Sequence, residues 1–112
     1  MQSWLRHARE ALVTAQTGNG FILWGTGSQA QRTLAEGLFD GMTVRAVVDS
    51  DPAKQGRKIT DHTVVAPAQG LKAAEGATVV ILAARSATYS IKNMLRAQYP
   101  DRPSITLTLV QD

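Results

Sequence analysis

A short apolar run that leads directly into two glycines is the feature that most constrains this fold. The run is Phe21-Ile22-Leu23-Trp24, and the next residues are Gly25-Thr26-Gly27-Ser28-Gln29-Ala30. Four consecutive apolar residues are typical of a central strand in a parallel sheet, where both faces are covered. Because Gly25 and Gly27 carry no Cβ, they let the backbone turn sharply and approach a ligand, and Ala30 permits close helix packing. The segment therefore predicts a strand, a glycine turn and a helix.

The rest of the chain alternates between strand and helix patterns. Apolar residues at helical spacing predict helices over residues 3–17, 28–39, 67–75 and 86–98. Runs rich in apolar and β-branched residues predict strands at residues 21–24, 44–49, 64–65, 77–83 and 105–110. Such alternation requires a parallel sheet with crossover helices. We therefore expect a three-layer, Rossmann-like, doubly wound α/β fold with a parallel sheet of about five strands. If the expected strands are numbered along the chain, their order across the sheet would be 3-2-1-4-5. We also expect an extra leading helix within residues 1–18.

Length and composition indicate one domain over residues 1–112. The chain is 44% hydrophobic and 19% charged, which favours a folded core over disorder. It has no cysteine, and its two histidines, His7 and His62, are far apart in the sequence, so neither a disulfide nor a metal site is expected. No stretch approaches the roughly 20 apolar residues of a membrane span, and no signal-peptide pattern begins the chain. A cytoplasmic location without membrane insertion is therefore expected.

The positive charge does not indicate a nucleic-acid partner. The formal net charge is +3, but the 12 Lys and Arg residues are scattered from Arg6 to Arg102. A nucleic-acid-binding surface normally gathers its basic residues on one face. Lys54, Arg57 and Lys58 form the densest group, within one expected loop. They fit either solvated loop charge or neutralisation of a diphosphate.

The glycine turn is the candidate binding site. A helix that begins there would present free N–H groups and its positive dipole end to a phosphate, and the hydroxyls of Thr26 and Ser28 would add two hydrogen bonds. Asp49 ends the next expected strand, 24 positions after Gly25. A carboxylate there accepts hydrogen bonds from ribose and repels a 2′-phosphate, so an unphosphorylated ribose is favoured. The alternative is that the glycines only form a tight turn and that Asp49 caps the Asp51-Pro52 turn.

Three further residues are expected opposite this turn. Ala84, Arg85 and Ser86 follow the fourth expected strand, so they would form the other wall of a crevice at the carboxyl end of the sheet.

Other patterns have simpler explanations than catalysis. Tyr89 and Lys92 resemble the tyrosine–lysine pair of short-chain dehydrogenases, but their spacing is i, i+3 instead of i, i+4, which favours an exposed helix face. Trp24 either stacks on a base or packs between sheet and helix, and packing is the favoured interpretation. His62 follows Asp61 in an expected turn, and general acid–base catalysis by His62 is a minor alternative to a role without catalysis. No catalytic residue is predicted, and neither a P-loop nor a methyltransferase core fits the glycine turn.

Three segments resemble a Rossmann-like nucleotide-binding module of bacterial sugar metabolism. They are residues 21–28, residues 47–59 with the pattern Asp-x-Asp-Pro-x-Lys-Gln-Gly, and residues 63–67. Similar modules form the N-terminal domains of nucleotide-sugar acyltransferases and polysaccharide-biosynthesis dehydratases, and the C-terminal domains of sugar C-methyltransferases. The resemblance implies a nucleotide-sugar or NAD(H) as ligand, without a metal. The ligand would lie over Gly25, Thr26, Gly27, Ser28 and Gln29, with Asp49, Ser50 and Asp51 near the ribose or base.

Three classes of function stay open. The leading hypothesis is a nucleotide- or nucleotide-sugar-binding module, non-catalytic alone, that works with a catalytic domain or subunit in bacterial surface-polysaccharide or sugar-nucleotide metabolism. The second is a small NAD-dependent oxidoreductase or transferase completed by homo-oligomerisation. The third is a scaffold whose pocket is vestigial and whose leading helix, residues 3–17, binds a partner chain.

Overall fold

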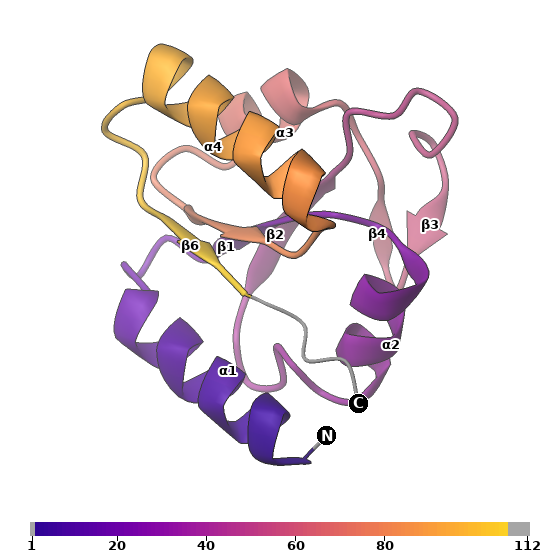
Figure 1. The fold of residues 1–112 in the computed structure, drawn as a ribbon, viewed down its shortest axis with the longest axis vertical. Helices are drawn as coiled ribbons and strands as arrows, with labels where there is room; N and C mark the ends of the chain where they lie inside the picture. Colours follow the sequence, from indigo (N-terminus) through magenta and orange to yellow (C-terminus); the bar gives the residue numbers. More distant parts are fainter. Residues whose placement is uncertain (1, 108–112) are drawn as a thin grey trace.

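The computed structural model describes residues 2–107, and it places a parallel β-sheet between two layers of helices (Figure 1). The sheet contains β1 (Phe21–Trp24), β2 (Val44–Val48), β5 (Thr78–Ile81) and β6 (Ser104–Thr106) in the spatial order β2-β1-β5-β6, and every neighbouring pair is parallel. The helices are α1 (Gln2–Ala15), α2 (Ser28–Ala35), α3 (Pro67–Ala73) and α4 (Arg85–Gln98). The expected α/β class with a parallel sheet is confirmed.

The expected strand count and order are wrong. The segment Val64-Val65, expected as a third strand beside β2, makes only an isolated bridge between Val65 and Val48. Pro67 begins α3 two residues later, and a proline has no N–H with which to continue a strand ladder. The residues just before this segment form an antiparallel hairpin of β3 (Lys58–Ile59) and β4 (His62–Thr63), which the sequence did not predict.

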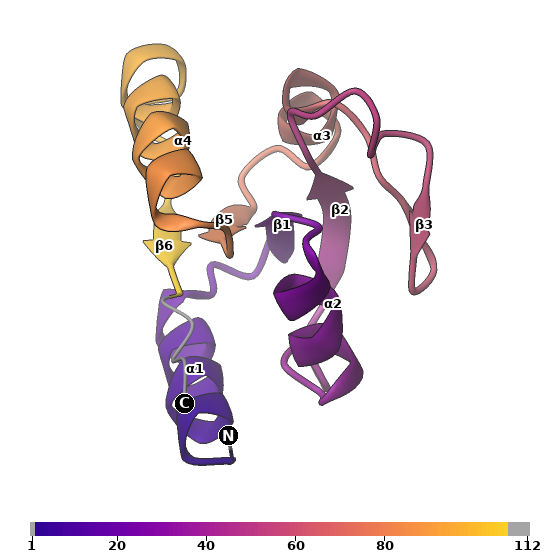
Figure 2. The ribbon, with the colours of Figure 1, turned by 45° about the vertical axis from the view of Figure 1, so that its right-hand side comes forward.

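The strands alternate their side chains between two cores. Phe21 and Leu23 face α1 and α2, whereas Ile22 and Trp24 face α3 and α4. Figure 2 shows these two pairs of helices on opposite sides of the sheet. Every residue of β1 and β5 is buried, and for β1 this confirms the prediction of a central strand covered on both faces.

Most element boundaries differ from the sequence-based expectation by one or two residues, and the end of α2 differs by more. α2 ends at Ala35 instead of near Phe39, because Gly37 adopts a φ of 97° and breaks the helix. Phe39 then packs against Phe21, with ring centroids 5.7 Å apart. The last strand was expected over residues 105–110, of which 108–110 lie outside the described residues. Within residues 2–107, no helix has the length and apolar character needed to cross a membrane.

Candidate functional site

A hollow of about 510 Å³ lies at the carboxyl ends of β1 and β5, which are neighbours in the centre of the sheet. The chain runs from β1 through α2 to β2 on one side, and from β5 through α4 to β6 on the other. Where connections diverge in this way, a crevice opens that commonly binds ligands in open α/β sheets. Asp51 and Ser86 do not line the hollow. The other predicted site residues do: Gly25, Thr26, Gly27, Ser28, Gln29, Asp49, Ser50, Ala84 and Arg85.

The two glycines of the turn differ in whether the fold requires a glycine at their position. Gly25 adopts a φ of 135°, and a Cβ built on it would lie 2.1 Å from the carbonyl oxygen of Leu82. The fold itself therefore requires glycine at position 25. Gly27 has an ordinary extended backbone, with φ −68° and ψ 172°, and a Cβ there would meet nothing within 4 Å. The fold does not require glycine at position 27, where a side chain would only occupy open space at the hollow.

The start of α2 faces the hollow without a cap. The first helical hydrogen bond runs from the N–H of Gln31 to the carbonyl of Gly27, at 3.0 Å. The N–H groups of Ser28, Gln29 and Ala30 precede it, so they have no acceptor within the helix. No side chain caps this end, and the first turn contains no acidic residue. The start of α2 therefore presents uncapped N–H groups at the hollow.

The start of α4 faces the same hollow. Ala84 is its N-cap residue, and the first helical bond joins the N–H of Thr88 to the carbonyl of Ala84 at 2.8 Å. This end also lacks a side-chain cap and an acidic first turn. Ala84, Arg85 and Ala87 line the hollow. Ala84, Arg85 and Ser86 were predicted for this wall from the sequence, but the helix terminus was not, although a helix that starts without a capping side chain after strand residues 77–83 was a usable signal.

Asp49 joins the glycine turn to the loop after β2. The hydroxyl of Thr26 donates to Asp49 Oδ2 at 2.6 Å, and the backbone N–H of Asp51 donates to Asp49 Oδ1 at 2.8 Å. Thr26 is 5% exposed, whereas Asp49 is half-buried and lines the hollow. Asp49 thus caps the following turn, as the alternative interpretation stated. The expected hydrogen bond from Thr26 to a phosphate does not match this geometry, because its hydroxyl is directed to Asp49.

The loop after Asp49 is held by local hydrogen bonds. Asp51 Oδ1 accepts from the N–H of Ala53 at 3.0 Å, so the Asp51 side chain shapes the turn, and Asp51 is not among the residues that line the hollow. Gln55 Nε2 donates to the carbonyl of Asp49 at 2.9 Å. Ser50 and Lys54 reach the hollow from this loop. These contacts give the Asp51 and Gln55 side chains a structural role in the loop.

The charges around the hollow favour an anionic ligand. Its titratable lining residues are Asp49, Lys54 and Arg85, two cations and one anion. Lys54 belongs to the basic group noted in the sequence, and it is the member of that group that lines the hollow. Its neighbours Arg57 and Lys58 are exposed and do not line it, which matches solvated loop charge.

The remaining candidates have structural explanations. Trp24 lines the hollow, but it is 4% exposed and packs in the core on the α3 and α4 side of the sheet, so the packing interpretation is confirmed. Tyr89 is 72% exposed and Lys92 is also exposed, as expected of an outward helix face. His62 lines a different hollow beside β2. Residues 2–107 contain no group of three or more His, Cys, Asp or Glu side chains arranged to hold a metal ion.

No protein family model, no curated protein and no solved structure matches this chain. The geometry and charge of the hollow are therefore the basis on which a function is assigned.

Proposed function

We propose that the hollow binds the diphosphate of a nucleotide or nucleotide-sugar. The observation that carries this proposal is that two uncapped helix starts, those of α2 and α4, line one hollow. A helix N-terminus carries the equivalent of roughly half a positive charge and exposes N–H donors, so it favours an anion. Two such ends, flanked by Lys54 and Arg85, suit two linked phosphates better than one.

The rest of the hollow suits a nucleoside. Asp49 lies at the end of β2, beside the glycine turn, where a carboxylate accepts hydrogen bonds from ribose hydroxyls. The Asp-x-Asp-Pro-x-Lys-Gln-Gly segment resembles nucleotide-binding modules of bacterial sugar metabolism. This resemblance supports a nucleotide-sugar or NAD(H) as ligand and a role as the binding module of a larger enzyme or complex in sugar-nucleotide or surface-polysaccharide metabolism.

Ligand-induced stabilisation tests the proposal. The melting temperature would be measured with NAD, NADP, UDP-sugars, dTDP-sugars, ATP and S-adenosylmethionine. A ligand at 100 times its dissociation constant stabilises the folded state by about 2.7 kcal/mol, which raises the melting temperature of a domain of this size by several degrees. At least one diphosphate-containing ligand is expected to do so. If no ligand shifts the melting temperature at millimolar concentration, the proposal is wrong.

A substitution at Gly27 separates binding from folding. Gly27→Asp would cap α2 and complement its dipole, so we expect the free protein to become more stable by about 0.5–1 kcal/mol. The new carboxylate would also occupy the space of the phosphate, so the ligand-induced shift should disappear. Ala66→Asp is the matched control, because Ala66 is the uncapped N-cap residue of α3 and does not line the hollow. This control should leave the ligand-induced shift intact, and a Gly27→Asp variant that still binds would place the phosphate elsewhere.

A further inference from the structure

The carboxylate of Asp49 is held from two directions before any ligand arrives. Its Oδ2 accepts the Thr26 hydroxyl at 2.6 Å, and its Oδ1 accepts the N–H of Asp51 at 2.8 Å. Thr26 is itself fixed, because it is 5% exposed and its carbonyl accepts from Gln31 Nε2 at 2.9 Å. The side chain of Asp49 therefore has one defined orientation at the wall of the hollow.

The number of free acceptor positions on this carboxylate is limited. An ionised carboxylate offers about four lone-pair sites, two on each oxygen. Thr26 and Asp51 occupy one site on each oxygen of Asp49, so one site on each oxygen is left. Two remaining acceptors match the two O–H donors of a ribose with free 2′ and 3′ hydroxyls. A 2′-deoxyribose would fill one of them, and a 2′-phosphate would bring a second anion against the carboxylate.

We infer that Thr26 is a positioning residue that makes the site select ribose with both hydroxyls free. The inference rests on the proposed function, since it concerns the sugar of a bound nucleotide. Thr26 lies within the glycine turn but acts through Asp49, which comes 23 positions later in the chain. Without the Thr26 hydroxyl, Asp49 Oδ2 loses its partner and the carboxylate is held only through Oδ1, by the N–H of Asp51. Its orientation is then less restricted, and Oδ2 has one more free acceptor position.

Matched ligand pairs test this selectivity on the unmodified protein. Isothermal titration calorimetry would compare NAD with NADP, and UDP-glucose with 2′-deoxy-UDP-glucose. Within each pair whose parent binds, the parent should bind about 10- to 100-fold more tightly, the range expected for one hydrogen bond to a charged group. Equal affinities within a pair would overturn the inference while leaving nucleotide binding intact. Failure of all four ligands to bind, with a dTDP-sugar still raising the melting temperature, would also overturn the inference while leaving nucleotide binding intact. Failure of every nucleotide in the melting-temperature panel would instead overturn the proposed function, and the inference would fall with it.

Variants at position 26 assign the selectivity to the hydroxyl. Thr26→Val keeps the shape of the side chain but not the donor, and it should reduce the parent-to-analogue affinity ratio about tenfold or more. Thr26→Ser restores the donor and should restore the ratio. A ratio that stays unchanged in Thr26→Val would overturn the inference, because a purely structural role would weaken both ligands equally.

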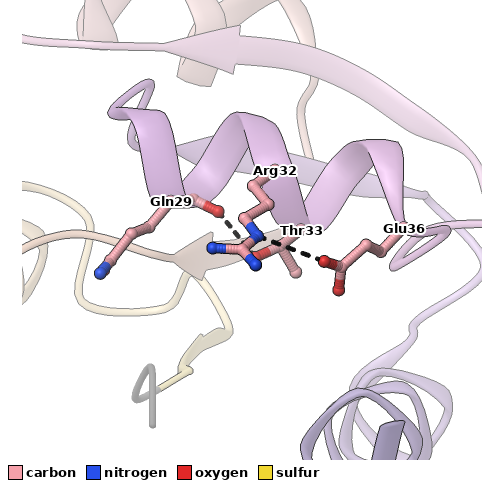
Figure 3. A network of polar contacts seen from close by, with 4 residues as sticks. All are labelled: Gln29, Arg32, Thr33 and Glu36. Atoms are coloured by element: carbon pink, nitrogen blue, oxygen red, sulfur yellow. Dashed lines mark hydrogen bonds and ion pairs between the residues drawn. The ribbon is translucent and has the colours of Figure 1, made fainter. Parts of the chain in front are cut away.

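A second buried threonine provides the control. Thr33 is 2% exposed, and its hydroxyl donates to the carbonyl of Gln29 at 2.7 Å within α2, next to the Arg32–Glu36 pair (Figure 3). Thr33 does not line the hollow, so Thr33→Val should alter stability without altering the affinity ratio. If Thr26→Val does not fold, Asp49→Asn tests the same hydrogen bond by changing its acceptor, the Asp49 carboxylate. That variant should bind NADP about as well as NAD, and a retained preference for NAD would contradict the inference.

Discussion

At the scale of single residues, the two glycines of the turn look alike in the sequence but have different roles. Gly25 serves the fold, because its backbone lies at a φ of 135° and passes close to the Leu82 carbonyl. Gly27 leaves space open at the hollow. We therefore expect Gly25→Ala to lower the free energy of unfolding by about 2–4 kcal/mol, through strain and steric overlap, and Gly27→Ala to change it by about 1 kcal/mol or less.

Urea denaturation of the two alanine variants measures this difference. The substitutions are chemically identical and two positions apart, so each serves as the control for the other. Equal losses of stability would show that both glycines are needed for the turn. In that case the absence of a side chain at position 27 would no longer point to a ligand.

At the scale of elements, the short helix α3 depends on arginines from elsewhere. Arg102, just before β6, donates to the carbonyls of Leu71 and Ala74 at 2.9 and 3.1 Å, at the C-terminal end of α3. A cation is favoured at this end of a helix, and these carbonyls have no partner within the helix. Arg45 of β2 donates to the nearby carbonyls of Ala73 and Glu75 at 3.3 and 3.2 Å.

We expect Arg102→Met to lower the free energy of unfolding by about 1–3 kcal/mol, because it removes two hydrogen bonds from a half-buried cation and keeps most of the apolar stem. The measurement is chemical denaturation followed by circular dichroism. Arg96→Met is the comparison, since Arg96 is exposed and donates to Asn93 Oδ1 at 3.5 Å. Similar losses in both variants would argue against a structural role for the Arg102 contacts.

The sequence predicts the central elements better than the peripheral ones. The strands β1 and β5 follow from uninterrupted apolar runs, and the helices around them follow from apolar residues at helical spacing. The hairpin of β3 and β4 has strands of two residues each, too short for any periodicity, and Val64-Val65 has strand composition but too little length before Pro67. At the site, the glycine turn and Asp49 are visible as a motif. The hydrogen bond between Thr26 and Asp49 is not, because it depends on how the strands β1 and β2 are placed side by side.

At the scale of the whole molecule, α1 is part of the folded unit. Its inner residues Ala8 and Leu12 are 6% and 0% exposed, and they pack with β1, β2 and β5 in the core on the α1 and α2 side. α1 also contacts β6 (Figure 1). The apolar side of the helix is thus occupied within the chain. A scaffold function based on residues 3–17 would have to use the outer face of α1 instead.

Adjacent aliphatic residues on α1 allow this role to be tested. Leu12→Ala would leave a cavity in the core and should lower the free energy of unfolding by about 2–5 kcal/mol, whereas Val13→Ala, at a side chain that is 52% exposed, should change it by about 0.5 kcal/mol or less. Because α1 and β1 share one core, the loss in Leu12→Ala should appear as a single shifted transition with an unchanged denaturant slope. A separate early transition would mean that α1 unfolds independently, and the sheet with its hollow would then be stable without the leading helix.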